Sequence, residues 1–323
     1  MKKLFIVNSR AEPRHLEIFK TAYSKYSSEH EGDAEILYTE YGGHAADIAR
    51  DAAARDDLLI VACGGDGTIH EVANVLAETE APMAIIPLGT GNDFARSVLD
   101  DAHRKDRELC VRDIFENRFN IINADLIKVT CYDRDGKINE SGTCWCNNIA
   151  SIGLDTEVQL RAKTKVLAKP NSRLVRDTAY LTSALDCVLG NRKFRFKYSA
   201  AKADGNTHTS NNNNYTLMAV CNASYYGHGF CPAPNAKIDD GLMNCCAVDA
   251  VGLPRSLYLL LKYKKGKHVG AGFKEMDIFD TSSLTIEALG DKELNGNYDG
   301  EDFSGHRVTF ECCPGTLRLA LYI

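Results

Sequence analysis

Residues 58–71 read Leu-Leu-Ile-Val-Ala-Cys-Gly-Gly-Asp-Gly-Thr-Ile-His-Glu, an apolar run followed by three glycines around one aspartate. The apolar run predicts a buried strand, and the glycines let a ligand approach the backbone closely. Thr68 and Glu71 have capping-box spacing, so we expect a helix to begin at Thr68, with free N–H groups that would stabilise an anion. No lysine follows as in a Walker loop, and an ordinary strand-turn-helix connection is the alternative.

A second stretch repeats this order. Residues 83–98 hold an apolar strand, then Pro87, a Gly-Thr-Gly turn and Asn92-Asp93 before another helix. The carboxyl ends of neighbouring parallel strands meet at one edge of a sheet, where open α/β sheets bind their ligands. The two glycine loops are therefore predicted to lie together.

The two stretches resemble the catalytic-domain family of diacylglycerol kinases, which includes bacterial diacylglycerol kinases and the sphingosine and ceramide kinases. The resemblance rests on Gly64-Gly65-Asp66-Gly67-Thr68 and on the run from Pro87 to Arg96, and it extends over nearly the whole chain. It implies an ATP-dependent lipid kinase with two domains and an active site in the cleft between them.

The pattern of apolar residues along the chain also indicates two domains. Residues 1–98 alternate apolar strands with helical patterns, which predicts a doubly wound parallel sheet, whereas the chain from about Asn120 is rich in strands and turns, which predicts antiparallel pairing. We expect a nucleotide-binding α/β domain over 1–125 and a β-rich, sandwich-like lipid-substrate domain over 126–304. By resemblance, 305–323 packs back onto the first domain. One helix is expected at about 173–189.

Composition restricts the class of protein. The 323 residues are 44% hydrophobic, enough for two cores, and the net charge of −6 argues against nucleic acid as a partner. No apolar run is long enough to cross a membrane, so we expect a cytoplasmic, peripherally membrane-associated protein. The twelve cysteines contain no Cys-x-x-Cys motif and are expected to be free core thiols in a reducing compartment, with a metal site at Cys144 and Cys146 as the alternative.

Family resemblance implies the residues that contact ATP. Asn8 is one of them, although Ser9 and Arg10 follow it where relatives usually continue with proline and glycine. The expected ATP contacts are Asn8, Thr39, Gly64, Gly65, Asp66, Gly67, Thr68, Thr90 and Asn92.

Three dispersed aspartates match the residues with which relatives hold catalytic Mg²⁺, partly through water: Asp66, Asp93 and Asp125. Retained waters and few carboxylates suit this ion. A helix N-cap for Asp93 and a strand-edge aspartate for Asp125 are the alternatives. A loop resembling a second, structural Mg²⁺ site would use the Asp240 side chain and the carbonyls of Lys237 and Leu242, although a plain Asp-Asp-Gly turn explains the same residues.

The run Asn297-Tyr298-Asp299-Gly300-Glu301 contains an Asp-Gly hairpin signal. Relatives carry an Asp-Gly-Glu here that supplies the proton acceptor. The resemblance thus implies Glu301 as general base, with Asp299 orienting it or sharing the role, and Asp66 as a rival for the base.

Two basic runs lack acidic residues. Residues 161–176 contain Arg161, Lys163, Lys165, Lys169, Arg173 and Arg176, and residues 255–267 combine four leucines with Lys262, Lys264, Lys265 and Lys267. A solvated face is the ordinary explanation. Local basic patches can nevertheless draw a negatively charged protein onto an anionic membrane.

Taken together, the sequence predicts a kinase that uses ATP and Mg²⁺ to phosphorylate a hydroxyl of a membrane lipid, with diacylglycerol as the expected acceptor and phosphatidic acid as the product. An NAD kinase and a catalytically silent nucleotide-binding regulator are the alternatives. The oligomeric state, including a homodimer, is left open.

Overall fold

A computed structural model describes residues 1–168, 193–202, 205–227 and 229–323, with isolated positions 172, 175, 178, 179, 182, 183, 186 and 187. The chain divides into two compact units. Unit 1 comprises Met1–Leu126, Ile238–Gly241 and Cys313–Ile323, and unit 2 comprises Ile127–Lys237 and Leu242–Cys312. The helix expected at about 173–189 and the end of the basic run, from Lys169, lie largely outside the described residues.

Unit 1 contains a parallel sheet in the order β2-β1-β3-β4-β16. Its strands are β1 (Lys2–Asn8), β2 (Ala34–Thr39), β3 (Leu58–Gly64), β4 (Met83–Pro87) and the end of β16 (Arg307–Tyr322). Its helices are α1 (Pro13–Glu29), α2 (His44–Ala53), α3 (Asp66–Leu76), α4 (Asp93–Val98), α5 (Asp101–Lys105) and α6 (Arg107–Phe115).

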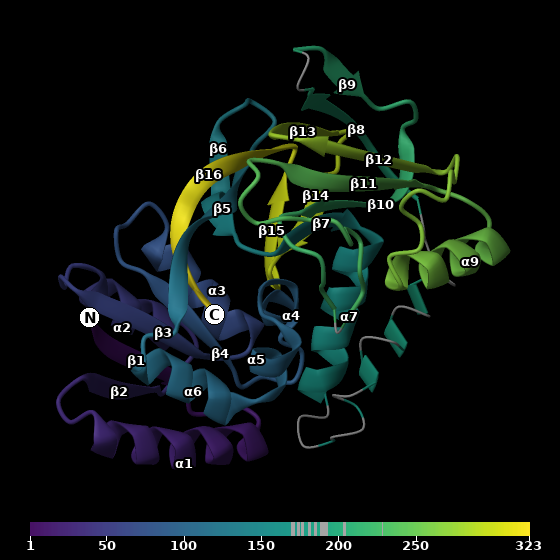
Figure 1. Ribbon diagram of the computed structural model, residues 1–323. Helices are drawn as coiled ribbons and strands as arrows, with labels where there is room; N and C mark the ends of the chain where they lie inside the picture. Colours follow the sequence, from purple (N-terminus) through teal and green to yellow (C-terminus); the bar gives the residue numbers. More distant parts are fainter. Residues whose placement is uncertain are drawn as a thin grey trace. The chain divides into compact units, whose positions relative to one another are not determined.

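The helices of unit 1 cover both faces of this sheet. Helices α1 and α6 pack together on one face, and α2 packs against α3 (Figure 1). All residues of β3 and β4 are buried. This burial on two faces explains why both strands read as unbroken apolar runs rather than as alternating patterns. The predicted parallel α/β class of the first domain is confirmed.

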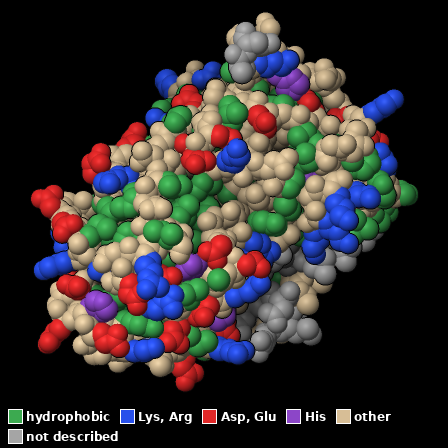
Figure 2. All heavy atoms as spheres, in the orientation of Figure 1, with side chains coloured by type: hydrophobic (Ala, Val, Ile, Leu, Met, Phe, Trp, Pro, Cys, Tyr) green, Lys and Arg blue, Asp and Glu red, His purple; other side chains and the backbone are tan. Residues whose placement is uncertain are grey.

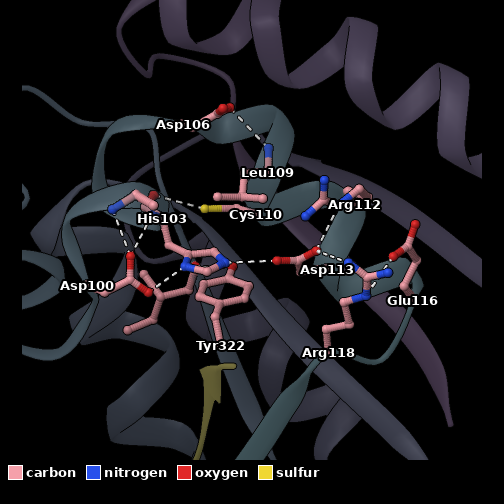
Figure 3. A network of polar contacts seen from close by, with 12 residues as sticks. Asp100, His103, Asp106, Leu109, Cys110, Arg112, Asp113, Glu116, Arg118 and Tyr322 are labelled. Atoms are coloured by element: carbon pink, nitrogen blue, oxygen red, sulfur yellow. Dashed lines mark hydrogen bonds and ion pairs between the residues drawn. The ribbon is translucent and has the colours of Figure 1, made fainter.

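A buried histidine joins α5, α6 and the end of β16 within unit 1 (Figure 3). The ring nitrogens of His103 lie 2.6 Å from Asp100 and 2.9 Å from Asp113, and the ring stacks on Tyr322 with centroids 4.2 Å apart. Burial acts to raise the pKa of Asp113, but hydrogen bonds from His103 and Arg112 outweigh it and lower that pKa. These contacts fix the last residues of the chain beside β4.

Unit 2 is built mainly of antiparallel strands. One run of neighbours is β15-β14-β7-β10-β11-β12, and β8 pairs with β9, β10 and β13. Its strands are β6 (Ile138–Cys146), β7 (Ile149–Gly153), β8 (Phe194–Ala201), β9 (Thr207–Thr209), β10 (Asn214–Cys221), β11 (Met243–Asp249), β12 (Met276–Thr281), β13 (Ser283–Ala288), β14 (Leu294–Tyr298) and β15 (Glu301–Gly305). The long strands β5 (Phe119–Tyr132) and β16 pair with each other and contribute residues to both units. The predicted β-rich class of the second domain is confirmed.

The strands β10 and β11 are covered on both faces. Met218 and Val220 belong to one hydrophobic core, whereas Leu217, Ala219 and Cys221 belong to a second core. The second core also includes residues of the helices α7 (Leu154–Ala168) and α9 (Leu253–Lys264). Two separate layers of side chains therefore hold unit 2 together.

The cysteines are packing residues. All twelve are free thiols, and ten of them are buried. Cys245 and Cys246 lie on opposite faces of β11, in different cores. Burial raises the pKa of the Cys144 thiol to about 11, so it is protonated at neutral pH. The predicted free core thiols are confirmed.

Within the described residues, no helix combines the length and the apolar character that crossing a membrane requires.

Candidate active site

The two glycine loops meet at the carboxyl edge of the unit 1 sheet. Gly64 at the end of β3 is in register with Pro87 at the end of β4, and the Leu88 N–H donates to the Gly64 carbonyl at 2.8 Å. The backbones then approach so closely that a Cβ atom built on Gly89 would lie 2.5 Å from the Cα of Gly65. Glycine is required at position 89 because a methyl group there would overlap the neighbouring loop.

Asn92 shapes the second loop. Its backbone has a φ of 51°, in the left-handed region, and it is the N-cap residue of α4. The side-chain amide donates to the Gly89 carbonyl at 2.7 Å and accepts from the Gly89 N–H at 3.0 Å. Asparagine tolerates this conformation better than most residues. Thr90, at the tip of the same turn, is exposed.

Asp66 links the starts of two helices. It is the first residue of α3, and its Oδ1 accepts the backbone N–H of Phe94, in the first turn of α4, at 3.0 Å. Asp93 begins α4, is buried, and lies 3.7 Å from the Arg96 guanidinium. The structure thus brings Asp66 and Asp93 to one pair of neighbouring helix starts.

The predicted capping box at Thr68 and Glu71 is wrong. Helix α3 begins two residues earlier, at Asp66, with Gly65 as its N-cap. The Glu71 carboxylate instead accepts the N–H groups of Gly43 and Ala45 at 3.0 and 3.2 Å. These two groups belong to the start of α2, so Glu71 caps the neighbouring helix rather than its own.

Three more of the expected ATP contacts lie at the same sheet edge. Asn8 and Thr39 end β1 and β2 and are paired in register. The Asn8 amide donates to the hydroxyl of Thr68 at 3.0 Å, which ties β1 to the first glycine loop. The residues expected to contact ATP therefore gather along the ends of β2, β1, β3 and β4.

Asp125 holds another loop of unit 1. Its carboxylate accepts the N–H groups of Gly241 and Gly315 at 2.7 and 3.0 Å, and its own N–H donates to the carbonyl of Ile238 at 2.6 Å. Asp240 lies in the segment that Asp125 fixes, and its side chain is exposed. Lys237 is exposed and Leu242 is half-buried at the two ends of this segment.

Among the described residues, no three or more Asp, Glu, His or Cys side chains gather closely enough to enclose a metal ion. One carboxylate oxygen of Asp66 accepts the Phe94 N–H, and both carboxylate oxygens of Asp125 accept backbone N–H groups. A divalent cation here would therefore have to be held by few carboxylates and by water, as Mg²⁺ commonly is.

In unit 2, Asp299 and Gly300 form the two-residue turn between β14 and β15. Both have positive φ, 49° and 98°, as a tight hairpin turn of this kind requires. The Asp299 carboxylate accepts the N–H groups of Asn147, Asn148 and Ile149 at 2.7, 3.1 and 3.0 Å. Asp299 therefore anchors the turn between β6 and β7.

Glu301 has different surroundings. Its side chain is exposed, and within the part of the chain that the structure describes no hydrogen bond or ion pair holds its carboxylate. Next to it, the Gly300 carbonyl accepts from Gln159 at 2.6 Å and from Lys163 at 2.7 Å. The turn between β14 and β15 is therefore held by several hydrogen bonds, while the Glu301 carboxylate is accessible to a substrate.

A polar cluster that the sequence reasoning misses lies at the start of α7. Asp155 is buried and accepts a hydrogen bond from the Tyr226 hydroxyl, which lies 3.4 Å from that of Tyr263. Burial raises the pKa of Asp155 to about 6. The only sequence signal was an acid after Gly153-Leu154 at a strand-helix junction, whereas both tyrosines are distant in sequence.

Two family models match the chain. The diacylglycerol kinase catalytic domain matches residues 2–127, and the YegS C-terminal NAD kinase beta sandwich-like domain matches residues 148–321. The α/β sheet with paired glycine loops and the β-rich unit that follows it thus correspond to the two parts of one class of lipid kinase. The chain belongs to the diacylglycerol kinase catalytic-domain family.

Individual relatives agree with this assignment. The chain is 26% identical to a "Probable lipid kinase YegS-like" protein of Stenotrophomonas maltophilia, over 90% of this chain and 84% of that protein. A protein of the same name from Pseudomonas aeruginosa is 27% identical, over 88% and 84%. Within the family, the chain is therefore similar to YegS-like lipid kinases of bacteria.

Solved structures show the same fold. A diacylglycerol kinase from Bacillus anthracis strain Sterne has a TM-score of 0.67 at 21% identity, with 100% of this chain and 97% of that chain covered. Yeast NADH kinase in complex with NADH has a TM-score of 0.52 at 11% identity, with 100% and 83% covered. At these identities the likeness concerns the fold alone.

Proposed function

We propose that this protein transfers the γ-phosphoryl group of ATP to the hydroxyl of diacylglycerol and so produces phosphatidic acid. The main support is the close backbone contact between the Gly65 and Gly89 loops, in a member of a lipid kinase family. Beside this contact, the Asp66 carboxylate accepts the Phe94 N–H. Phosphoryl transfer depends mainly on positioning and on electrostatic stabilisation, and both loops offer backbone to a phosphate.

In this proposal unit 1 binds the nucleotide. Asn8, Thr39, Thr90 and the 64–68 loop lie along one sheet edge, and α3 begins there with the positive end of its dipole, which favours a phosphate. The two hydrogen bonds between the Asn92 side chain and Gly89 hold the second loop in shape, so the loop is formed before ATP binds. The sites then need little reorganisation on binding.

The acidic residues of unit 1 fit a divalent cation that is held partly through water. Asp66 and Asp93 are the residues that would hold it, and Asp125 would fix the adjoining 238–241 loop. Mg²⁺, when bound, neutralises charge on the transferred phosphoryl group. The Asp240 loop remains a candidate for a second, structural ion, with the Lys237 and Leu242 carbonyls.

Glu301 is proposed as the proton acceptor for the lipid hydroxyl. The carboxylate of Asp299 already accepts three backbone N–H groups, whereas that of Glu301 is exposed and can reorient toward a substrate. We therefore assign Asp299 to holding the hairpin and Glu301 to accepting the proton. A general base in this role contributes about 10²- to 10⁴-fold to the rate.

The experiment is a transfer assay with γ-labelled ATP and Mg²⁺. Diacylglycerol, a sphingoid base, ceramide and phosphatidylglycerol are offered separately in mixed micelles, and NAD is offered in solution because yeast NADH kinase shares the fold. Label in phosphatidic acid, above all other products, is expected. Label in another lipid would change the acceptor, and label in NAD alone would replace the lipid kinase by an NAD kinase.

A further inference from the structure

Helix α9 has two apolar faces, although a surface helix ordinarily has one. Ser256, Leu259 and Tyr263 are buried and Leu260 is half-buried, at the spacing i, i+3, i+7 and i+4 of one helix face. Leu259 and Tyr263 belong to the same hydrophobic core as Leu217 and Val248 of β10 and β11, and Leu260 packs against this core. This inner face accounts for the packing of the helix onto unit 2.

The second face points to solvent. Pro254, Leu257, Tyr258 and Leu261 repeat the same i, i+3, i+4, i+7 spacing, and all four are exposed. Leu257, Tyr258 and Leu261 are 37%, 43% and 62% exposed. Single exposed apolar residues are normal, but an aligned stripe of them on a helix indicates an interaction surface.

Lysines extend this stripe. Lys262, Lys264, Lys265 and Lys267 follow it, and within the described residues none of them forms an ion pair. Lys262 lies 5.3 Å from the Tyr258 ring centroid, so positive charge and aromatic surface are adjacent. Figure 2, in the orientation of Figure 1, shows basic and apolar side chains together where α9 lies.

The basic residues of α7 are arranged differently. Lys163 lies 3.2 Å from Asp302, Lys165 lies 2.7 Å from Asp186, and Arg161 lies 3.8 Å from Glu157. Their charge is largely compensated within unit 2. In the first basic run, the described basic side chains thus form ion pairs with acidic residues. Of the two runs, only the second, on α9, combines lysines without ion pairs among the described residues with exposed apolar side chains.

We infer that the outer face of α9 and Lys262–Lys267 bind the surface of an anionic lipid bilayer. The leucines and the tyrosine would enter the headgroup region, where an amphipathic tyrosine is favourable, and the lysines would lie level with the anionic headgroups. A water-soluble polyanion would use the lysines but would leave the apolar stripe exposed. The inference rests on the proposed lipid kinase function in one respect: membrane binding would bring the enzyme to its lipid substrate.

Sedimentation with sucrose-loaded vesicles tests the surface without nucleotide. The vesicles are equimolar phosphatidylglycerol and phosphatidylcholine, or phosphatidylcholine alone. Lys262→Gln/Lys264→Gln/Lys265→Gln/Lys267→Gln should weaken binding to the anionic vesicles at low salt by about 100-fold or more, since each lysine contributes about fivefold. High salt should remove most of that difference because the attraction is screened.

Leu257→Ser/Leu261→Ser should weaken binding about tenfold at either salt concentration, because apolar burial is not screened. Matched controls are Lys163→Gln/Lys165→Gln, whose lysines are paired, and Ile138→Ser, where the isoleucine is 59% exposed on β6. Both controls should bind as the unchanged protein does, and the α9 variants should keep their thermal midpoints.

Three results would overturn the inference: no sedimentation of the unchanged protein with anionic vesicles, equal losses in the controls, or a loss that needs the lysines but not the leucines. The last would mark a site for a soluble polyanion. Phosphorylation of a short-chain, water-soluble diacylglycerol should be unaffected in every α9 variant. Failure of the membrane surface and failure of the kinase proposal therefore give different results.

Discussion

Asp299 and Glu301 stand two residues apart on one hairpin and have different surroundings. Glu301→Gln should lower kcat by at least about 100-fold and leave stability unchanged, because its exposed carboxylate bonds to no other residue that the structure describes. Asp299→Asn should lower the free energy of unfolding by about 1–3 kcal/mol, because the new amide places an N–H₂ group against backbone donors. Steady-state kinetics and urea unfolding separate the two effects. Normal turnover in Glu301→Gln with lost turnover in a folded Asp299→Asn would move the base to Asp299.

Asp155 gives a pH dependence of stability that the sequence did not suggest. Burial raises its pKa in the folded state to about 6, against about 3.9 in an unfolded chain. Ionisation therefore favours unfolding: stability falls as pH rises from about 4 to about 6, and the full cost, about 3 kcal/mol, persists above pH 6.

Asp155→Asn removes the charge and keeps an acceptor for Tyr226. In urea unfolding, its stability relative to the unchanged protein should rise by about 3 kcal/mol between pH 4 and pH 7. A stability difference that is constant over this range would show that Asp155 is not held in an environment that disfavours its charge.

At the scale of elements, the close approach of the two glycine loops can be tested by adding one methyl group. A Cβ at Gly89 would meet Gly65 at 2.5 Å and the Asn92 Oδ1 at 2.8 Å, whereas a Cβ at Gly67 would meet nothing within 4 Å. Gly89→Ala should lower the free energy of unfolding by about 1–3 kcal/mol. Gly67→Ala, inside α3, should leave it unchanged or raise it by about 0.5–1 kcal/mol. Equal stability of the two variants would contradict the described contact.

The same elements show which structural features can be predicted from the sequence and which cannot. Strands β3 and β4 and the meeting of their loops follow from apolar runs and glycines that are local in sequence. The capping box failed because Glu71 has the right spacing for α3 but finds its partners at Gly43 and Ala45, on another helix. A side chain that bonds across tertiary structure cannot be assigned from spacing alone.

At the scale of the whole molecule, the two fold classes follow from the change of pattern near Asn120. What does not follow is that the short segment Ile238–Gly241 belongs to unit 1. Neither the composition nor the periodicity of this segment distinguishes it from its neighbours. In the structure, the Asp125 carboxylate connects the segment to unit 1 by accepting the Gly241 N–H. The roles of the residues at the candidate site stay predictions, because a role depends on a substrate as well as on geometry.

In the proposed function, the paired glycine loops around Asp66 carry out phosphoryl transfer to a lipid. The most direct measurement compares transfer from γ-labelled ATP to short-chain diacylglycerol by the unchanged protein, Asp66→Ala and Asp66→Asn, with thermal midpoints in parallel. Asp66→Asn keeps an acceptor for the Phe94 N–H while it removes the negative charge. We predict labelled phosphatidic acid from the unchanged protein and at least about a 100-fold loss in both folded variants. Turnover in Asp66→Asn equal to that of the unchanged protein would contradict the claim.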